Sequence, residues 1–244
     1  MDISKRRILR DTEQVVQTNR VMLEAQGIHY IPSDSCLHTG TALLIGRPDT
    51  PYFGGFYFFD ITFPTDYPFS PIKVQTLTQD GHTRFNPNLY IQGKVCLSIL
   101  NTWHDGPQWS GVQTLESVLL AILSDVLCAN PLENEPAYAR CGATAEAQMY
   151  NRLIWYANLQ TAIYGHLLGE QPYSTPFRSI MMASFLTHAP AILQRATESA
   201  VDDGKKECCR AFSMSHTYDF KGLVEKLNQV KNLNTSIPPI DSAQ

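Results

Sequence analysis

The stretch RFNPNLYIQGKVCLSILNTW, residues 84–103, lies in the middle of a chain of 244 residues and places Cys96 in an apolar run directly after a polar loop. Between residues 81 and 95 the pattern shows no clear helical or strand period. Such a long aperiodic segment inside a compact domain is often functional. Cys96 is therefore either a small packing residue or a nucleophile presented by a functional loop.

The segments before this stretch have strand composition. Glycine- and proline-containing turns separate four predicted strands, at residues 28–31, 41–46, 55–63 and 72–78. Since no helix is predicted between them, an antiparallel meander is favoured. The apolar residues of 55–63 do not alternate cleanly, so the pattern does not assign the two faces of that strand.

Helical patterns surround the predicted sheet. Apolar residues at helical spacing predict helices at residues 4–25, 113–128, 143–168, 177–198 and 218–233. Charged residues and Gly204 predict an exposed loop at 202–206. The sequence thus predicts an α+β fold with a helical C-terminal extension.

Composition excludes some classes of function. Nineteen basic and 23 acidic residues give a formal charge of −4, which argues against nonspecific nucleic-acid binding. No apolar segment is long enough to cross a bilayer, and the N-terminus is too polar for a signal peptide. The six cysteines are expected to be reduced thiols, and none has the spacing of zinc ligands.

Four landmarks follow one another between residues 5 and 165. They are Tyr67-Pro68-Phe69-Ser70-Pro71, Asn86-Pro87-Asn88, Cys96 at eight residues after Asn88, and Trp109-Ser110 before a predicted helix. In this order and spacing they resemble the landmarks of ubiquitin-conjugating enzymes. Three departures are Asn86, where the family usually has histidine, Gly111, where it usually has proline, and Ile72, where it usually has the second proline of a Pro-Pro pair.

The run FNPNLYIQGKVCLSILNTW, residues 85–103, is similar to the Z-type, or Use1-type, conjugating enzymes. The later pieces NEP (134–136) and YNRLI (150–154) share this similarity. The resemblance implies an N-terminal helix, a four-stranded antiparallel meander, an active-site loop and a central helix. It also implies a core domain over residues 1–169 and a helical extension over residues 170–244 that packs on the core.

The resemblance implies an acyltransferase. Cys96 would accept ubiquitin, or a ubiquitin-like protein, as a thioester from an activating enzyme and pass it to a substrate lysine with a ligase. Asn88 would donate to the developing oxyanion, although Asn-Pro-Asn is also good turn chemistry. Glu135 would orient the lysine, with Glu133 as its competitor and an exposed loop acid as the plain alternative.

Further residues are expected to act through surfaces. The basic cluster Lys5, Arg6, Arg7 and Arg10 resembles the surface that meets the activating enzyme; the alternative is a solvated helix face. Phe69 is either an anchor for a ligase or a core residue. No bound cofactor or metal is expected, because the activating enzyme uses the ATP. No nucleic-acid or membrane partner is expected, and the expected location is the cytoplasm, with the nucleus as a second one.

Two other classes of function compete with this interpretation. A noncatalytic ubiquitin-binding variant of the same fold would keep the surface but never become loaded. A cysteine hydrolase would need a histidine beside the thiol, and His82 and His104 are the nearest along the chain.

Overall fold

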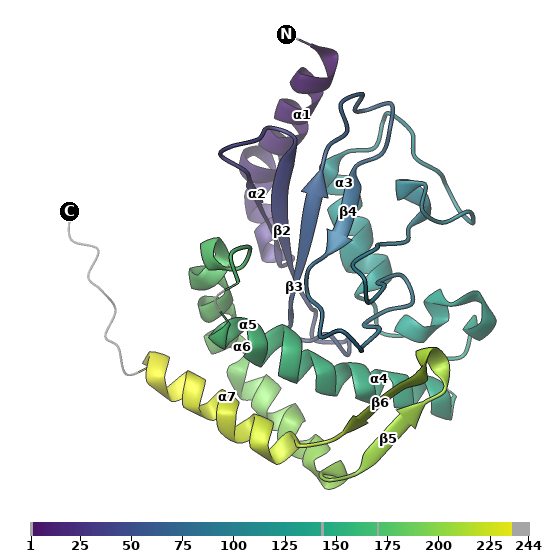
Figure 1. Cartoon of the computed structure of the whole chain (residues 1–244). Coiled ribbons are helices and arrows are strands. Elements are labelled where there is room, and N and C mark those ends of the chain that lie inside the picture. Colours follow the sequence, from purple (N-terminus) through teal and green to yellow (C-terminus); the bar gives the residue numbers. More distant parts are fainter. Residues whose placement is uncertain (1, 143, 170, 236–244) are drawn as a thin grey trace, which may run out of the picture.

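The computed structural model describes residues 2–142, 144–169 and 171–235. An antiparallel sheet forms its centre, and its strands are neighbours in space in the order in which they follow along the chain (Figure 1). They are β1 (Ile28–Pro32), β2 (Thr39–Ile45), β3 (Phe56–Thr62) and β4 (Lys73–Thr76). The structure confirms the predicted meander, with each strand within a few residues of its predicted bounds.

Strand β3 is buried on both faces, which explains why its apolar residues do not alternate with polar ones. Successive side chains of a strand point to opposite faces. The Phe58 ring lies 5.5 Å from that of Phe177, in the C-terminal part of the chain, whereas Tyr57 on the other face lies 5.7 Å from Phe85. A strand covered on both faces has no polar side from which a period of two can be seen.

The helix predicted at residues 4–25 is interrupted. It consists of α1 (Ile3–Glu13), a π-helical turn (Gln14–Thr18) and α2 (Arg20–Ala25). Asn19, between the last two, leaves the helical conformation at φ −104° and ψ 9°. Ile8, Val15 and Leu23 are all buried, so the apolar stripe stays continuous across the break.

The helix after the cysteine loop is α3 (Leu115–Ala121), which continues as a π-helical turn (Ile122–Val126). Thr114 begins it with a capping box: the Thr114 side chain accepts from the Ser117 backbone N–H, and the Ser117 hydroxyl accepts from the Thr114 backbone N–H. The predicted helix at 143–168 is α4 (Ala145–Ala157), a π-helical segment (Asn158–Gly165) and α5 (His166–Leu168). Residue 143 lies outside the described residues.

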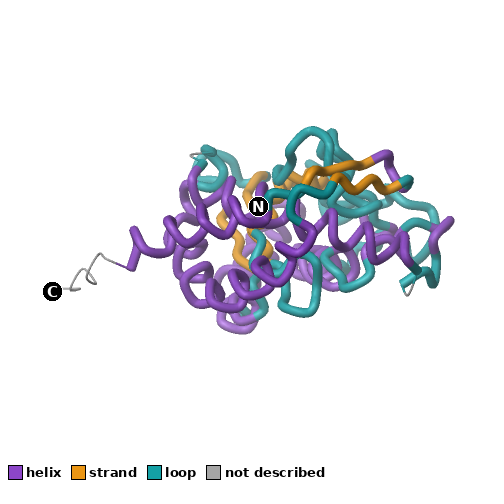
Figure 2. The backbone as a smooth tube through the Cα atoms, turned by 90° about the horizontal axis from the view of Figure 1, so that it is seen from below, coloured by secondary structure: helices purple, strands orange, loops and turns teal. Residues whose placement is uncertain are grey.

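The C-terminal part contains α6 (Arg178–Ser199) and α7 (Phe220–Thr235), as predicted, and a hairpin that the sequence does not predict. The hairpin strands are β5 (Lys206–Cys209) and β6 (Met214–Thr217). Figure 2 shows the strands in two separate groups, with helices beside both. Short 3₁₀ turns cover Ser98–Leu100, Pro131–Asn134, Pro136–Tyr138, Thr175–Phe177, Ala200–Asp202 and Ala211–Ser213.

The hairpin escapes prediction because its inward-facing positions are not all apolar. Glu207 on β5 and His216 on β6 are buried and lie opposite each other. Glu207 is tolerated there because Arg152 of α4 donates two hydrogen bonds to it, at 2.6 and 3.0 Å. Because the partner of such a buried carboxylate is not visible in the sequence, the charged residue predicts an exposed loop rather than a strand.

The C-terminal segment contacts the rest of the chain through aromatic and cationic side chains. The Phe220 and Tyr156 rings lie 5.2 Å apart, and the Arg195 guanidinium lies 4.1 Å from the Trp155 ring. The division of the chain at residue 169 stays a prediction, and residues 170 and 236–244 of the predicted extension lie outside the described residues. Within the described part, no helix combines the length and the apolar character that crossing a membrane requires.

Candidate active site

Cys96 and Asn88, eight residues apart, are paired through their backbones and one side chain. The Cys96 backbone N–H donates to the Asn88 carbonyl at 2.9 Å, and the Asn88 side-chain amide donates to the Cys96 carbonyl. The structure therefore brings together the two residues that the sequence predicts to act on one substrate.

Asn86 holds this loop in place through hydrogen bonds of its buried side chain. Its side chain is wholly buried, accepts from the Asn88 backbone N–H at 2.7 Å and donates to the Val126 carbonyl at 2.8 Å. The Asn134 amide donates to Asn86 Oδ1 at 3.3 Å. Asn86 thus joins the loop to the end of the central helix and to the segment after it, which is a structural role.

The Asn88 amide has unused hydrogen-bonding capacity. A side-chain amide carries two N–H donors and one carbonyl acceptor. One donor is engaged by the Cys96 carbonyl, and the buried Oδ1 has no hydrogen-bond partner. Asn88 holds the loop in this structure, and its second side-chain N–H has no acceptor among the described residues. The turn role and the oxyanion role are therefore compatible.

Cys96 is covered, with 2 % of its surface exposed. It does not belong to the contiguous hydrophobic core, although the adjacent Val95 and Leu97 do, as does the other buried cysteine, Cys209. Lys94, two residues before Cys96, is exposed. Cys96 is therefore buried in this structure, with a core residue on either side of it along the chain.

A groove adjoins the residues that flank Cys96. It has a volume of about 650 Å³ and is lined, among others, by Lys94, Val95 and Thr102. Thr102 closes the turn after Cys96, since its hydroxyl accepts from the Leu97 N–H at 2.9 Å and donates to the Val95 carbonyl at 2.9 Å. The segments on both sides of the cysteine thus border open space.

Glu135 lies half-buried between two 3₁₀ turns, directly after Asn134, which bonds to Asn86. Its competitor Glu133 is engaged, because Glu133 Oε1 accepts from the Gly142 N–H at 2.8 Å. Burial is the main cause that raises the pKa of Tyr150, and the nearby Glu135 carboxylate adds to it. Glu135 is therefore the less occupied of the two acids, close to the loop that carries Asn88.

The N-terminal basic cluster divides into two parts. Lys5, Arg6 and Arg10 are exposed and share one face of α1. Arg7 instead pairs with Asp11 at 2.8 Å and donates to the carbonyls of residues 111 and 113 at 2.9 and 2.7 Å. Arg7 holds the loop before α3, so only the other three side chains present charge to solvent.

Phe69 is 77 % exposed, so it is not a core residue. The Tyr67–Pro68 peptide before it is cis, and the Trp109 indole donates to the Pro68 carbonyl at 2.8 Å. Val112, on the loop that Trp109 begins, is also exposed. Two neighbouring loops thus present separate apolar side chains to solvent.

Sequence reasoning missed Arg84. Its guanidinium lies 3.5 Å from the Tyr90 ring centroid and 4.7 Å from that of Phe212, and it donates to the Pro87 carbonyl at 2.6 Å. Arg84 therefore joins the Asn86–Asn88 loop to the turn of the C-terminal hairpin. Only its place directly before the Phe85-Asn86 step could have drawn attention to it.

The two histidines nearest to Cys96 in sequence have other neighbours. His82 Nδ1 lies 3.4 Å from Asp80 Oδ1, and His104 Nε2 lies 3.5 Å from Asp105 Oδ2. The structure thus provides no support from these two residues for a hydrolase dyad.

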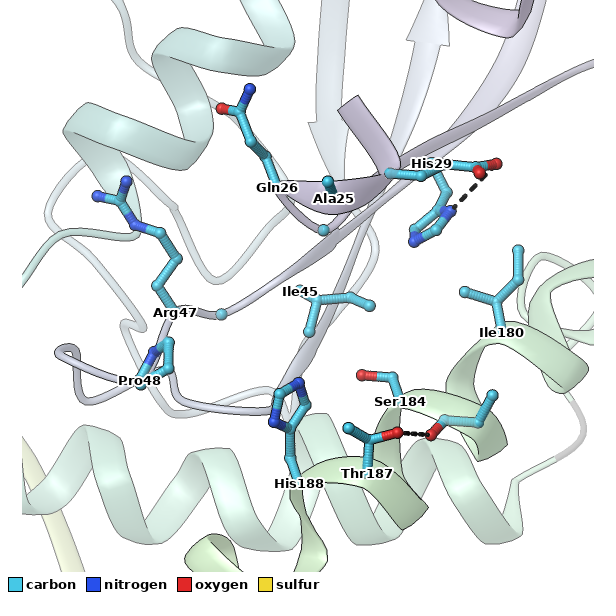
Figure 3. A pocket seen from close by; sticks show the side chains of 14 residues that line it. Ala25, Gln26, His29, Ile45, Arg47, Pro48, Ile180, Ser184, Thr187 and His188 are labelled. Atoms are coloured by element: carbon cyan, nitrogen blue, oxygen red, sulfur yellow. Dashed lines mark hydrogen bonds and ion pairs between the residues drawn. The ribbon is translucent and has the colours of Figure 1, made fainter. Parts of the chain in front are cut away.

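A second groove, of about 670 Å³, lies between the end of α2, strand β2 and α6 (Figure 3). His29, Arg47 and His188 line it, and Glu24 Oε1 lies 3.9 Å from His29 Nδ1. None of the predicted site residues lines this groove.

The family described as "Ubiquitin-conjugating enzyme" matches residues 7–156. The chain is 39 % identical over 163 residues to ubiquitin-conjugating enzyme E2 Z of Homo sapiens, covering 66 % of this chain and 46 % of that protein. It is 34 % identical over 218 residues to E2 Z of Danio rerio, covering 88 % and 66 %.

The chain is also 47 % identical over 138 residues to the dual E2 ubiquitin-conjugating enzyme/E3 ubiquitin-protein ligase BIRC6 of Mus musculus, covering 53 % of this chain and 3 % of that protein. The chain spans about half to two thirds of the length of the E2 Z relatives that it matches.

Proposed function

Because this chain belongs to the ubiquitin-conjugating enzyme family, and is of the Z type, we propose that it carries ubiquitin or a ubiquitin-like protein as a thioester on Cys96. The observation that carries the proposal is the pairing of Cys96 with Asn88 in a loop that Asn86 fixes. The product is an amide between the carried carboxyl group and a lysine of a protein substrate.

Loading is an exchange of thioesters. The Cys96 thiolate attacks the carbonyl carbon of the thioester on the activating enzyme, a new C–S bond forms, and the old C–S bond breaks. The departing sulfur takes up the proton that Cys96 gave up. Because the acyl group arrives already activated, the thiol does not need a histidine base beside it. ATP is used by the activating enzyme, and no metal or nucleotide is needed on this chain.

Transfer to lysine builds negative charge on the thioester oxygen as the amine attacks. We assign the stabilisation of that charge to the second N–H of the Asn88 side chain, and losing such a donor costs about 2.7–4 kcal/mol of barrier. The C–N bond forms, the C–S bond to Cys96 breaks, and the amine loses a proton. We assign the orientation of the amine and the acceptance of its proton to Glu135, because Glu133 is held by Gly142.

We assign the surfaces that bind partner proteins from the exposed side chains among the predicted residues. Lys5, Arg6 and Arg10 form an exposed positive face for the activating enzyme. Phe69 and Val112 are two exposed apolar side chains on neighbouring loops, and we assign them to a ligase. Activating enzyme, cargo, ligase and substrate are all proteins that act in the cytoplasm and nucleus, where we place this chain.

The cover over Cys96 favours one alternative, a ubiquitin-binding variant that is never loaded. The two functions are separated by incubating the chain with activating enzymes, ATP and either ubiquitin or ubiquitin-like proteins. A reductant-sensitive adduct that disappears when free lysine is added supports the transferase. Binding of the cargo without an adduct from any donor supports the noncatalytic variant. Release of free ubiquitin from an amide-linked substrate supports the hydrolase.

A further inference from the structure

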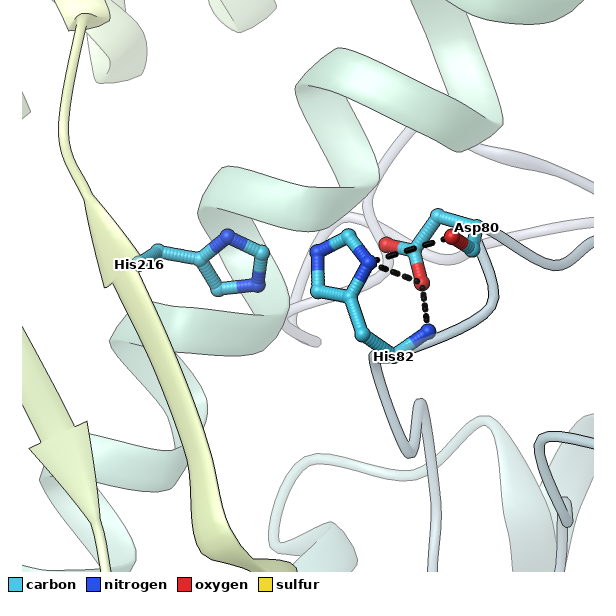
Figure 4. A group of neighbouring side chains, drawn as sticks. All are labelled: Asp80, His82 and His216. Carbon is cyan, nitrogen blue, oxygen red and sulfur yellow. Dashed lines mark hydrogen bonds and ion pairs between the residues drawn. The ribbon is translucent and has the colours of Figure 1, made fainter.

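Three side chains that can ligate a metal meet where the C-terminal hairpin contacts the loop leading to the cysteine. Asp80 and His82 flank Gly81 in a turn after β4, and His216 lies on β6 (Figure 4). One ligand atom from each residue lies within 4.8 Å of the other two. Two parts of the chain more than 130 residues apart thus supply one group of donors.

The three residues differ in exposure in a way that suits a site at a surface. The His216 residue is 8 % exposed, the Asp80 side chain 14 % and the His82 side chain 60 %. The two imidazole rings lie 5.1 Å apart. The buried His216 and the half-buried Asp80 fix the position of the site, and His82 can close it from the solvent side.

The carboxylate is already oriented. Thr83 donates to Asp80 through its hydroxyl and its backbone N–H, both at 2.6 Å, and the His82 backbone N–H donates at 3.0 Å. The Thr83 hydroxyl also lies 3.0 Å from His216 Nε2. A hydrogen-bonded carboxylate of this kind holds a ligand oxygen in a fixed direction.

The donor set suits a borderline transition metal better than calcium or magnesium. Two imidazoles and one carboxylate are typical of zinc sites that keep an open position. Metal–ligand distances of about 2.0–2.2 Å place tetrahedral ligands about 3.3–3.6 Å apart. The present separation of up to 4.8 Å therefore has to shrink by about 1.2–1.5 Å, which the exposed His82 allows by rotating. Both imidazoles must be neutral to ligate.

We propose that Asp80, His82 and His216 form a binding site for a divalent transition metal of the zinc class. A metal bound there clamps β6 onto the segment that leads into the active-site loop. The same hairpin already contacts this segment, since the Arg84 N–H donates to Met214 Sδ at 3.1 Å and Phe212 stacks on Arg84. The metal would thus tie the C-terminal extension to the loop that holds Asn88.

The test is zinc titration of the full, metal-depleted chain, without activating enzyme or cargo, so that it does not depend on the proposed function. One equivalent is expected to bind and to raise the thermal midpoint. His82→Gln is the main variant, because an exposed side chain is removed at little cost to folding, and it is expected to lose at least about tenfold in affinity. His216→Asn is expected to do the same. His104→Gln, an exposed histidine beside Asp105, is the matched control and should bind like the native chain.

The six cysteines provide competing ligands, so Co²⁺ serves as a second probe. Cobalt at the proposed site gives ligand-field bands without a thiolate-to-cobalt charge-transfer band. The proposal is overturned if zinc does not bind, if His82→Gln binds as tightly as the native chain, or if the cobalt spectrum is that of a thiolate site.

Discussion

The two roles of Asn88, in holding the loop and in stabilising an oxyanion, can be separated by experiment. Its side-chain amide donates one N–H to the Cys96 carbonyl, which holds the loop, and the second N–H is the proposed oxyanion donor. Changing the side chain affects different steps according to which role matters. A residue that only shaped the loop would affect loading and transfer together. A residue that stabilises an oxyanion acts most strongly on the slower attack by the amine.

We expect Asn88→Ala to slow discharge of a preloaded thioester onto free lysine by about 10²–10³-fold, the cost of losing one oxyanion donor. The measurement is single-turnover discharge after the activating enzyme has been quenched. Asn101→Ala, in the turn after the cysteine, is the control for a general loosening of the loop. Equal rates for native chain and Asn88→Ala would remove the oxyanion role.

His166 gives the chain a pH-dependent stability. Burial lowers its pKa from 6.5 to about 4. Between these values the unfolded chain binds more protons than the folded one, so stability falls as the pH drops below 6.5. We expect the native chain to lose about 2 kcal/mol more than His166→Gln between pH 7.5 and 5, measured by urea unfolding. Parallel losses in the two proteins would show that His166 titrates normally.

At the scale of elements, the hairpin is the part that sequence reasoning could not place. The meander could be predicted because its turns contain glycine and proline and no helix interrupts it. The hairpin could not, since Glu207 and His216 face inward and are satisfied only by partners such as Arg152 and Thr83. The sequence landmarks predicted Asn88 and Cys96 as site residues. The role of Arg84 could not be predicted, because it depends on the contact with Phe212, which only folding creates.

Phe212 tests whether the hairpin supports the active-site loop. It stacks on Arg84 and holds a backbone conformation with φ 59°, which favours glycine. We expect Phe212→Ala and Phe212→Gly both to slow discharge of the loaded thioester severalfold, because both lose the ring.

The two variants should differ in stability, since glycine removes the backbone strain. We expect Phe212→Gly to be about 1 kcal/mol more stable than Phe212→Ala. Urea unfolding gives the stabilities. Unchanged discharge in both variants would mean that the hairpin has no influence on the loop.

At the scale of the whole molecule, charge is distributed unevenly. The chain carries a formal charge of −4, yet Lys5, Arg6 and Arg10 gather on one exposed face of α1. A local positive face on an acidic protein directs encounter with an acidic partner and depends on salt.

Reversal of Lys5 and Arg6 to glutamate is expected to lower the rate of loading by the activating enzyme about tenfold or more at low salt, with a smaller effect at high salt. Initial rates of adduct formation measure this. The control is Lys206→Glu, which reverses one exposed charge on β5 and is compared with the single variant Lys5→Glu. If Lys206→Glu slows loading as much as the Lys5→Glu reversal on α1, the N-terminal positive face is not a specific binding surface for the activating enzyme.

The cover over Cys96 raises the question on which the proposed function depends, namely whether the sulfur becomes reachable when a donor arrives. Cys36 and Cys208 are free and exposed, so they provide internal competitors on the same chain. An adduct on either of them would mimic loading in a gel. The position of the acyl group therefore has to be determined directly.

The decisive measurement is peptide mass spectrometry of the chain after incubation with activating enzyme, cargo and ATP, without reductant. We predict the cargo's C-terminal carboxyl on the peptide that contains Cys96, with no adduct in Cys96→Ala and full loading in a Cys36→Ser, Cys208→Ser double variant. An adduct that maps to another cysteine, or that persists in Cys96→Ala, would contradict the assignment of Cys96 as the acyl carrier.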